Sequence, residues 1–225
     1  MGTIGVFLVG VVLLVNGLVM LNVVPPRSAA PLNLFVGAIQ IVFPTIILIQ
    51  SGGDPTVAAA TWPTYLFGIT YLYYGLNIIF DLEPEGFGWF CGFVAVAAAY
   101  QAITTAAADP IFAVIWLTWA IMWSLFFALL ALDAQKLTPF SGWFLVLLGV
   151  PSCSISSVFL LEGTWSTSAL AGLAALAVLA LATVSAVVLS RISFRTAPRT
   201  AADNAELATA SPAPAQVNPE PVPAT

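Results

Sequence analysis

Long apolar blocks alternate with short polar connections along most of this chain. Hydrocarbon about 30 Å thick needs about 20 apolar residues per spanning helix, and seven blocks approach that length: Ile4 to Leu21, Leu32 to Ile49, Tyr65 to Phe80, Phe87 to Ile103, Ile111 to Leu132, Phe140 to Leu161 and Ala169 to Ser190. The pattern predicts an all-α, polytopic membrane protein with seven transmembrane helices. Pro44 and Pro151 fall inside the second and sixth blocks, where we expect kinks and not breaks.

The basic residues favour one orientation. All of them follow odd-numbered blocks: Arg27 after the first, Lys136 after the fifth, and Arg191, Arg195 and Arg199 after the seventh. Because positive residues are retained on the cytoplasmic side, we expect the N-terminus outside, the C-terminus inside, and a location in the plasma (inner) membrane.

The last block and the residues after it differ from the rest. Ala169 to Ser190 contains small and aliphatic residues and no aromatic, so we expect a peripheral, lipid-facing helix added to a six-helix core. After Phe194 the composition changes to Ala, Pro, Thr, Asn and Glu, which cannot bury enough apolar area to fold. We therefore expect a transmembrane domain over residues 1–194 and a disordered cytoplasmic tail over residues 195–225.

Composition excludes several classes of function. With 60% hydrophobic and 7% charged residues, the chain has no room for a soluble catalytic domain. Histidine is absent, and Cys91 and Cys153 have no second ligand at metal-binding spacing, so we expect no metal, no cofactor and no enzyme activity. The only lysine, Lys136, falls in a connection, which excludes a retinal Schiff base in the membrane. Nucleic acid is not an expected partner.

The acidic residues all lie near the ends of blocks or in the tail, and none falls at mid-membrane. A carboxylate buried in the membrane is the usual mark of a proton- or ion-coupled carrier. Its absence from the sequence favours passive permeation of a neutral solute.

Three tryptophans interrupt the aliphatic pattern of the fifth block. Trp116, Trp119 and Trp123 are spaced i, i+3, i+7, which places their indoles on one stripe of a helix. Indoles normally lie at the membrane interface, whereas this stripe crosses the middle of the block. Two interpretations stay open: a helix packed into a bundle by bulky residues, or the wall of a conduit or ligand pocket.

One face of the first block and one of the third carry uncharged polar groups at i, i+3, i+4, i+7 spacing. The faces are formed by Leu13, Asn16, Gly17 and Met20, and by Thr70, Tyr73, Tyr74 and Asn77. Each Asn can instead join two helices by hydrogen bonds. Together with the indoles, these groups suit a small planar amide. Removing an amide from water costs about 4–8 kcal/mol, and aromatic stacking returns about 1–3 kcal/mol per contact. The Born penalty would exclude ions.

Three blocks stand in an order and spacing that resemble the urea and short-chain amide channels of the UreI and AmiS family. They are VNGLVMLNVVPPRSAAPLNLFVGAIQI, YLFGITYLYYGLNIIF, and IWLTWAIMWSLFF followed by KLTPF. The resemblance implies a homo-oligomeric ring, hexameric in the urea channels, with one pore in each protomer. It also implies that Leu13, Asn16, Tyr73, Trp119 and Trp123 line the constrictions, with Asn77 close by.

Three departures from this family pattern change the expectation. Ile69 stands where the urea-channel branch tends to have an aromatic residue, which favours wider selectivity and an aliphatic amide. Acid-gated members carry periplasmic histidines and extra membrane carboxylates, whereas this chain has no His and has Leu129 at one aligned acidic position, so acid gating is not expected. The seventh helix fits the AmiS-like branch better.

The leading hypothesis is a passive facilitator for urea, acetamide and similar short-chain amides that feeds a cytoplasmic amidase or urease. The candidate pore-lining residues are Leu13, Asn16, Ile69, Thr70, Tyr73, Asn77, Trp116, Trp119 and Trp123. Two alternatives are a proton-coupled amide carrier and a non-transporting membrane subunit or sensor that binds a partner through its tail.

Overall fold

Every regular element that the structure describes is helical. The structure is a computed structural model that describes residues 2–196, with side chains described for residues 2–192. The long helices are α1 (Gly2–Met20), α2 (Pro26–Gln50), α3 (Pro55–Phe80), α4 (Glu85–Thr105), α5 (Pro110–Ala131) and α8 (Ala169–Thr196). The remaining span is built from the 3-10 turn η1 (Gln135–Leu137), α6 (Thr138–Gly149), the π-helical η2 (Val150–Ile155) and α7 (Ser156–Leu161). The seven predicted helices are confirmed. Residues 197–225 of the predicted tail lie outside the described residues.

Six segments are long and apolar enough to cross a membrane: α1, α2, α4, α5, α8 and the continuous η1-to-α7 segment. The seventh segment, α3, has a similar length, but its prolines, threonines, tyrosines and asparagine lower its hydropathy. The chain is therefore a multi-pass membrane protein. Its helices run through Pro31, Pro44 and Pro63 without a break, and at Pro151 the helix takes the wider π form.

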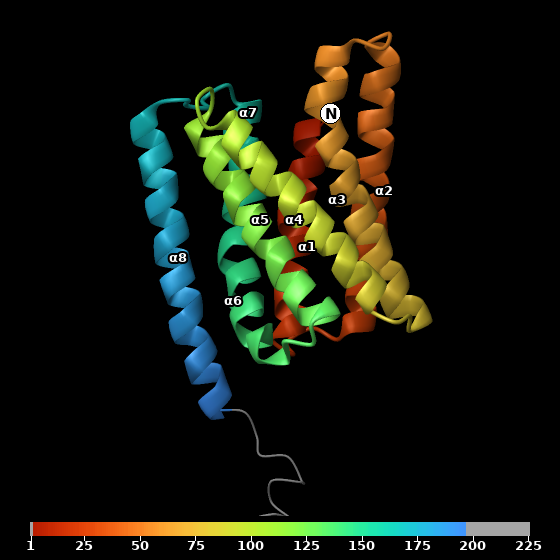
Figure 1. The fold of residues 1–225 in the computed structure, drawn as a ribbon, viewed down its shortest axis with the longest axis vertical. Helices are drawn as coiled ribbons and strands as arrows, with labels where there is room; N and C mark the ends of the chain where they lie inside the picture. The colour runs from red at the N-terminus through yellow and green to blue at the C-terminus, as the bar shows by residue number, and fades with distance from the viewer. Residues whose placement is uncertain (1, 197–225) are drawn as a thin grey trace, which may run out of the picture.

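Helices α1 to α6 form a closed ring. Each packs against the next in chain order, and α6 packs back against α1. Helix α8 lies outside this ring and packs against α5 and α6 (Figure 1). Only 17% of its spanning window is buried, against 28% to 44% for the other five apolar spans. The predicted six-helix core with a peripheral seventh helix is confirmed.

The contact of α1 with α6 depends on two glycines. A Cβ atom on Gly17 would lie 2.8 Å from the carbonyl oxygen of Gly142, and one on Gly142 would lie 2.8 Å from Leu21. Because neither residue has a side chain, the two backbones can touch. This close contact closes the ring.

The basic residues belong to elements that meet at one end of the bundle. Arg27 belongs to the first turn of α2, Lys136 to η1 and Arg191 to the last turns of α8. Figure 1 shows the α1–α2 connection, the α5–α6 connection and the end of α8 at the same end. This arrangement agrees with the positive-inside pattern, and the N-out, C-in orientation stays a prediction.

Candidate functional site

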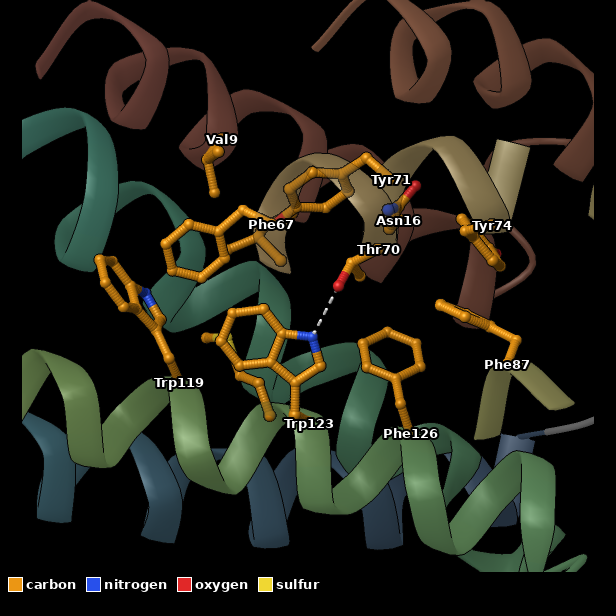
Figure 2. A pocket seen from close by; sticks show the side chains of 12 residues that line it. Val9, Asn16, Phe67, Thr70, Tyr71, Tyr74, Phe87, Trp119, Trp123 and Phe126 are labelled. Atoms are coloured by element: carbon orange, nitrogen blue, oxygen red, sulfur yellow. Dashed lines mark hydrogen bonds between the residues drawn. The ribbon is translucent and has the colours of Figure 1, made fainter. Parts of the chain in front are cut away.

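A small cavity lies inside the ring between α1, α3, α4 and α5 (Figure 2). Its volume is about 20 Å³, enough for about one water molecule. The side chains that line it come from stripes on successive turns: Val9, Leu13 and Asn16 of α1, Phe67, Thr70, Tyr71 and Tyr74 of α3, Phe87 of α4, and Trp119, Met122, Trp123 and Phe126 of α5. Seven residues of helix rise about 10 Å, so the lining stripes extend over about two turns of each of these helices along the bundle.

Phe67 lies at the centre of an aromatic cluster at one end of this cavity. Its ring stacks on Trp123 with centroids 4.8 Å apart and on Trp116 at 5.8 Å, and it meets Trp119 edge to face at 5.0 Å. Trp116 and Trp119 also meet edge to face at 4.9 Å. All four rings are buried. The tryptophan stripe of α5 is therefore joined across the ring to α3 by one phenylalanine.

Both indole N–H groups of the lining tryptophans are used within the protein. Trp123 donates to Oγ1 of Thr70 at 3.3 Å, the dashed line in Figure 2. Trp119 donates to the Ser152 hydroxyl at 3.1 Å, in the π-helical segment η2. Since the N–H edges point at protein partners, these indoles present mainly their rings to the cavity.

Asn16 is a lining residue with spare hydrogen-bonding capacity. It forms a reciprocal pair with Asn33 of α2: each Nδ2 donates to the other Oδ1, at 2.9 and 2.8 Å. Asn33 also donates to the Ala29 carbonyl at 3.0 Å. A primary amide has two N–H donors and an oxygen with two lone pairs, so Asn16 retains one donor and one acceptor site. The Asn33 pair holds the amide in place.

All twelve lining side chains are uncharged. The carboxylates of Asp54 and Asp109 cap helices at the ends of the bundle, where they accept from the backbone N–H of Thr56 at 2.7 Å and of Phe112 at 2.9 Å. Among the described residues, no group of His, Cys, Asp and Glu side chains could hold a metal ion. The cavity therefore offers ring faces and neutral hydrogen-bonding groups, and its walls carry no ion pair and no proton-accepting carboxylate.

The structure brings most of the predicted site residues together around this cavity. Those that line it are Leu13, Asn16, Thr70, Trp119 and Trp123. Trp116 lies beside it, with its ring stacked on Phe67 at an interplanar angle of 12°, and does not line it.

Three predicted residues of α3 lie away from the cavity. Ile69 is 41% exposed on the outer surface, Tyr73 packs against Phe87 at 5.1 Å, and the buried Oδ1 of Asn77 accepts no hydrogen bond within the described residues. The reason is the rotation of α3 about its axis. Gly68 and Gly75 pack against residues of α2, and this contact fixes which face of α3 points into the ring. The face that points inward carries residues 67, 70, 71 and 74, whereas the predicted face carried residues 70, 73, 74 and 77.

Comparison with known proteins gives a consistent result. The model of a family described as AmiS/UreI family transporter matches residues 1–164. A Rhodococcus erythropolis protein that carries the transporter name AmiS2 is 49% identical over 170 residues, which cover 75% of this chain and 82% of that protein. A Mycolicibacterium smegmatis protein named as an amidate substrates transporter is 44% identical over 193 residues, which cover 84% of this chain and 88% of that protein.

A more distant relative has a solved structure. The acid-activated urea channel of Helicobacter pylori is 29% identical over 189 residues, which cover 70% of this chain and 95% of the channel. The crystal structure of the urea channel from this bacterium matches the fold with a TM-score of 0.66 at 28% identity. The match covers all of that chain and 74% of this one.

Proposed function

Because the chain belongs to the AmiS/UreI family of transporters, we propose that it is a passive channel for small neutral amides, such as acetamide and urea. The solute passes along the aromatic cavity between α1, α3, α4 and α5. The observation that carries this proposal is the lining itself, which combines buried ring faces with the spare amide groups of Asn16 and with no charge.

The lining suits a planar amide energetically. An amide that loses its water without replacement faces a cost of about 4–8 kcal/mol on a cyclohexane scale. Stacking on an aromatic ring returns about 1–3 kcal/mol per contact if base stacking is a fair guide, and a hydrogen bond to Asn16 adds about 1 kcal/mol. Two ring contacts and one hydrogen bond thus offset most of the cost. An ion would face a much larger desolvation penalty that neutral rings cannot offset.

The size of the cavity makes the described conformation a constricted one. Space for about one water molecule is too small for acetamide or urea, so the solute must displace the surrounding rings as it passes. Because these rings are buried and packed on one another, their displacement sets the barrier. We therefore expect flux to be highest for the smallest amides and to fall steeply with solute size.

A passive mechanism is favoured over a proton-coupled carrier by the positions of the acidic residues. Those in the described part of the chain lie at helix ends or in connections, as in Asp54, Asp81, Asp109, Asp133 and Glu162. A coupled carrier needs a protonatable group within its solute path. Uptake that survives an uncoupler at an unchanged amide concentration is expected for the channel, and uptake abolished by the uncoupler would support the carrier.

Stopped-flow measurements on proteoliposomes test the proposal directly. Purified protein in vesicles of defined lipid is exposed to an inward gradient of acetamide or urea, and the light scattering of swelling vesicles gives the flux. We expect flux well above that of protein-free vesicles for both amides, with no added leak of protons or potassium. Amide flux equal to that of empty vesicles would reject the channel.

The cellular role follows from a passive pore. We propose that the protein lies in the plasma membrane with its N-terminus outside, assembles into a homo-oligomeric ring, and supplies amide to a cytoplasmic amidase or urease that keeps the inward gradient. It performs no catalysis itself. The rival role, a non-transporting subunit or sensor, depends on the tail. A chain lacking residues 201–225 should conduct amide as the full chain does, whereas a full chain that conducts no amide and binds a partner only when the tail is present would support the rival.

A further inference from the structure

A second cavity lies outside the ring, between α5, the η2–α7 segment and α8. Its volume is about 350 Å³, within the range of small-molecule sites and far larger than the inner cavity. Ala175, Val178 and Leu179 of α8 form part of its wall. Helix α8 follows the residues 1–164 that the family model matches, so the added helix completes the wall of this cavity. No residue that the structure describes lines both cavities, although Ser152 of the outer wall accepts from Trp119 of the inner one.

Three hydroxyls in the wall of this outer cavity, those of Thr118, Ser152 and Ser156, donate to carbonyls of their own helices, and Ser152 also accepts from Trp119 of α5. The Thr118 hydroxyl donates to the Val114 carbonyl at 2.8 Å, and the Ser156 hydroxyl donates to the Pro151 carbonyl at 2.9 Å. Hydroxyls bonded back to their own helix turn their carbon atoms outward. Most of the other wall residues are aliphatic or aromatic, and apolar cavities tend to stay dry. The cavity therefore suits an apolar occupant.

Trp165 lies at one end of the outer cavity. Its ring lines the cavity, while its indole N–H donates to Oδ2 of Asp109 at 2.7 Å. Asp109 caps α5, so this end of the cavity is the one near the α4–α5 and α7–α8 connections (Figure 1). Indoles are typical of the membrane interface, where the N–H keeps a polar partner, as the Asp109 carboxylate provides here. Thr164 and Ser166 line the same end of the cavity.

We propose that the outer cavity binds one acyl chain of a membrane lipid, with the headgroup near Trp165 and the chain running between α5 and α8. Lipid is the medium around these helices, and an unfilled cavity would leave its wall atoms without dispersion contacts. Transfer from bulk lipid brings no hydrophobic gain, because lipid tails are as apolar as the wall. The site is thus held by packing, so the bound chain exchanges with bulk lipid.

Photo-crosslinking in vesicles tests the site. The full chain is reconstituted into phosphatidylcholine vesicles that contain phosphatidylcholine with a diazirine on its acyl chain, irradiated, and digested for peptide mass spectrometry. We expect labelling on the inward-facing wall, in residues 111–118 and 148–159. Labelling confined to the exposed face of α8 would refute the proposal. A neighbouring copy of the chain in the cavity would also leave this wall unlabelled, and that result would likewise refute lipid binding there.

A matched pair of variants separates the cavity from the surface of the helix. Ala175→Phe fills the cavity, whereas Ala174→Phe adds the same ring at an exposed neighbouring position that does not line it. We expect Ala175→Phe to lower wall labelling at least fivefold and Ala174→Phe to leave it within twofold. Equal labelling in both variants would overturn the proposal. If Ala175→Phe fails to assemble, Ala175→Leu fills less space and tests the same point.

Discussion

Removal of the Phe67 ring should widen the range of amides that pass. Phe67 is 4% exposed and contacts the rings of Trp116, Trp119 and Trp123 at 5.8, 5.0 and 4.8 Å. Its side chain lines a cavity of only about 20 Å³. In Phe67→Ala the six-membered ring is lost, so the free space at the constriction grows severalfold unless the tryptophans collapse into it.

The magnitude follows from these contacts. Each aromatic pair contributes about 0.5–1.5 kcal/mol beyond its buried area, so the three pairs contribute about 1.5–4.5 kcal/mol. The total cost of Phe→Ala in protein cores, which also includes lost burial and the cavity, is about 3–5 kcal/mol. We expect a lower melting temperature and a fall of about tenfold in the ratio of acetamide to butyramide flux, which corresponds to about 1.4 kcal/mol of lost discrimination.

The assay is stopped-flow flux of acetamide, propionamide and butyramide in proteoliposomes, with protein content measured in each preparation. Phe93→Ala is the matched control, because Phe93 lies on the outer surface of α4 and is 63% exposed. It should change neither the flux ratio nor the melting temperature. A folded Phe67→Ala protein with an unchanged flux ratio would show that Phe67 does not control solute size. Phe67→Leu, which keeps most of the volume, should keep the fold while it loses the ring faces.

Three further predictions follow from the same geometry. Trp123→Ala should alter acetamide flux in proteoliposomes at least fivefold, whereas Trp89→Ala, at a 64% exposed position of α4, should leave it within twofold; equal effects would indicate general packing. Asn33→Leu should lower the melting temperature, because it leaves the buried Asn16 amide without its partner at a cost of about 1–3 kcal/mol. The Asn16→Leu, Asn33→Leu double variant should recover the melting temperature but not the acetamide flux. Full recovery of flux in the double variant would show that Asn16 has no role in permeation. Because the chain has no histidine, the side chain that normally titrates between pH 5 and 8, acetamide flux should change less than twofold between pH 5 and pH 7.5; a steep rise at low pH would point to gating by another group.

Apolar patterning predicted the helices well, and the errors have physical causes. The third helix was predicted to begin at Tyr65 and begins at Pro55, because its first turns are rich in Thr, Ala and Pro and carry little apolar signal. The cap was visible in the sequence: Asp54 accepts from the Thr56 N–H, and Pro55 occupies the first helical position. The π-helical form of η2 around Pro151 has no equivalent in a hydropathy pattern.

The candidate site was predicted on α1 and α5 and only partly on α3. Tryptophan and asparagine are rare enough in apolar helices for Trp119, Trp123 and Asn16 to be noticed. Phe67 and Tyr71 were missed because aromatic residues are common in cores and only the fold brings them opposite the indoles. The inward face of α3 is set by its glycine contacts with α2, and the seven-residue spacing of Gly68 and Gly75 was the available signal for that rotation.

The inner cavity draws all of its walls from a single polypeptide, from α1, α3, α4 and α5. Subunits in an assembly therefore need not cooperate to conduct, as they must in a channel whose lumen lies on a shared symmetry axis. Coreconstitution of active and blocked copies in varying proportions should reduce permeability linearly with the blocked fraction. A blocked copy in such an assembly would leave the pores of its neighbours open.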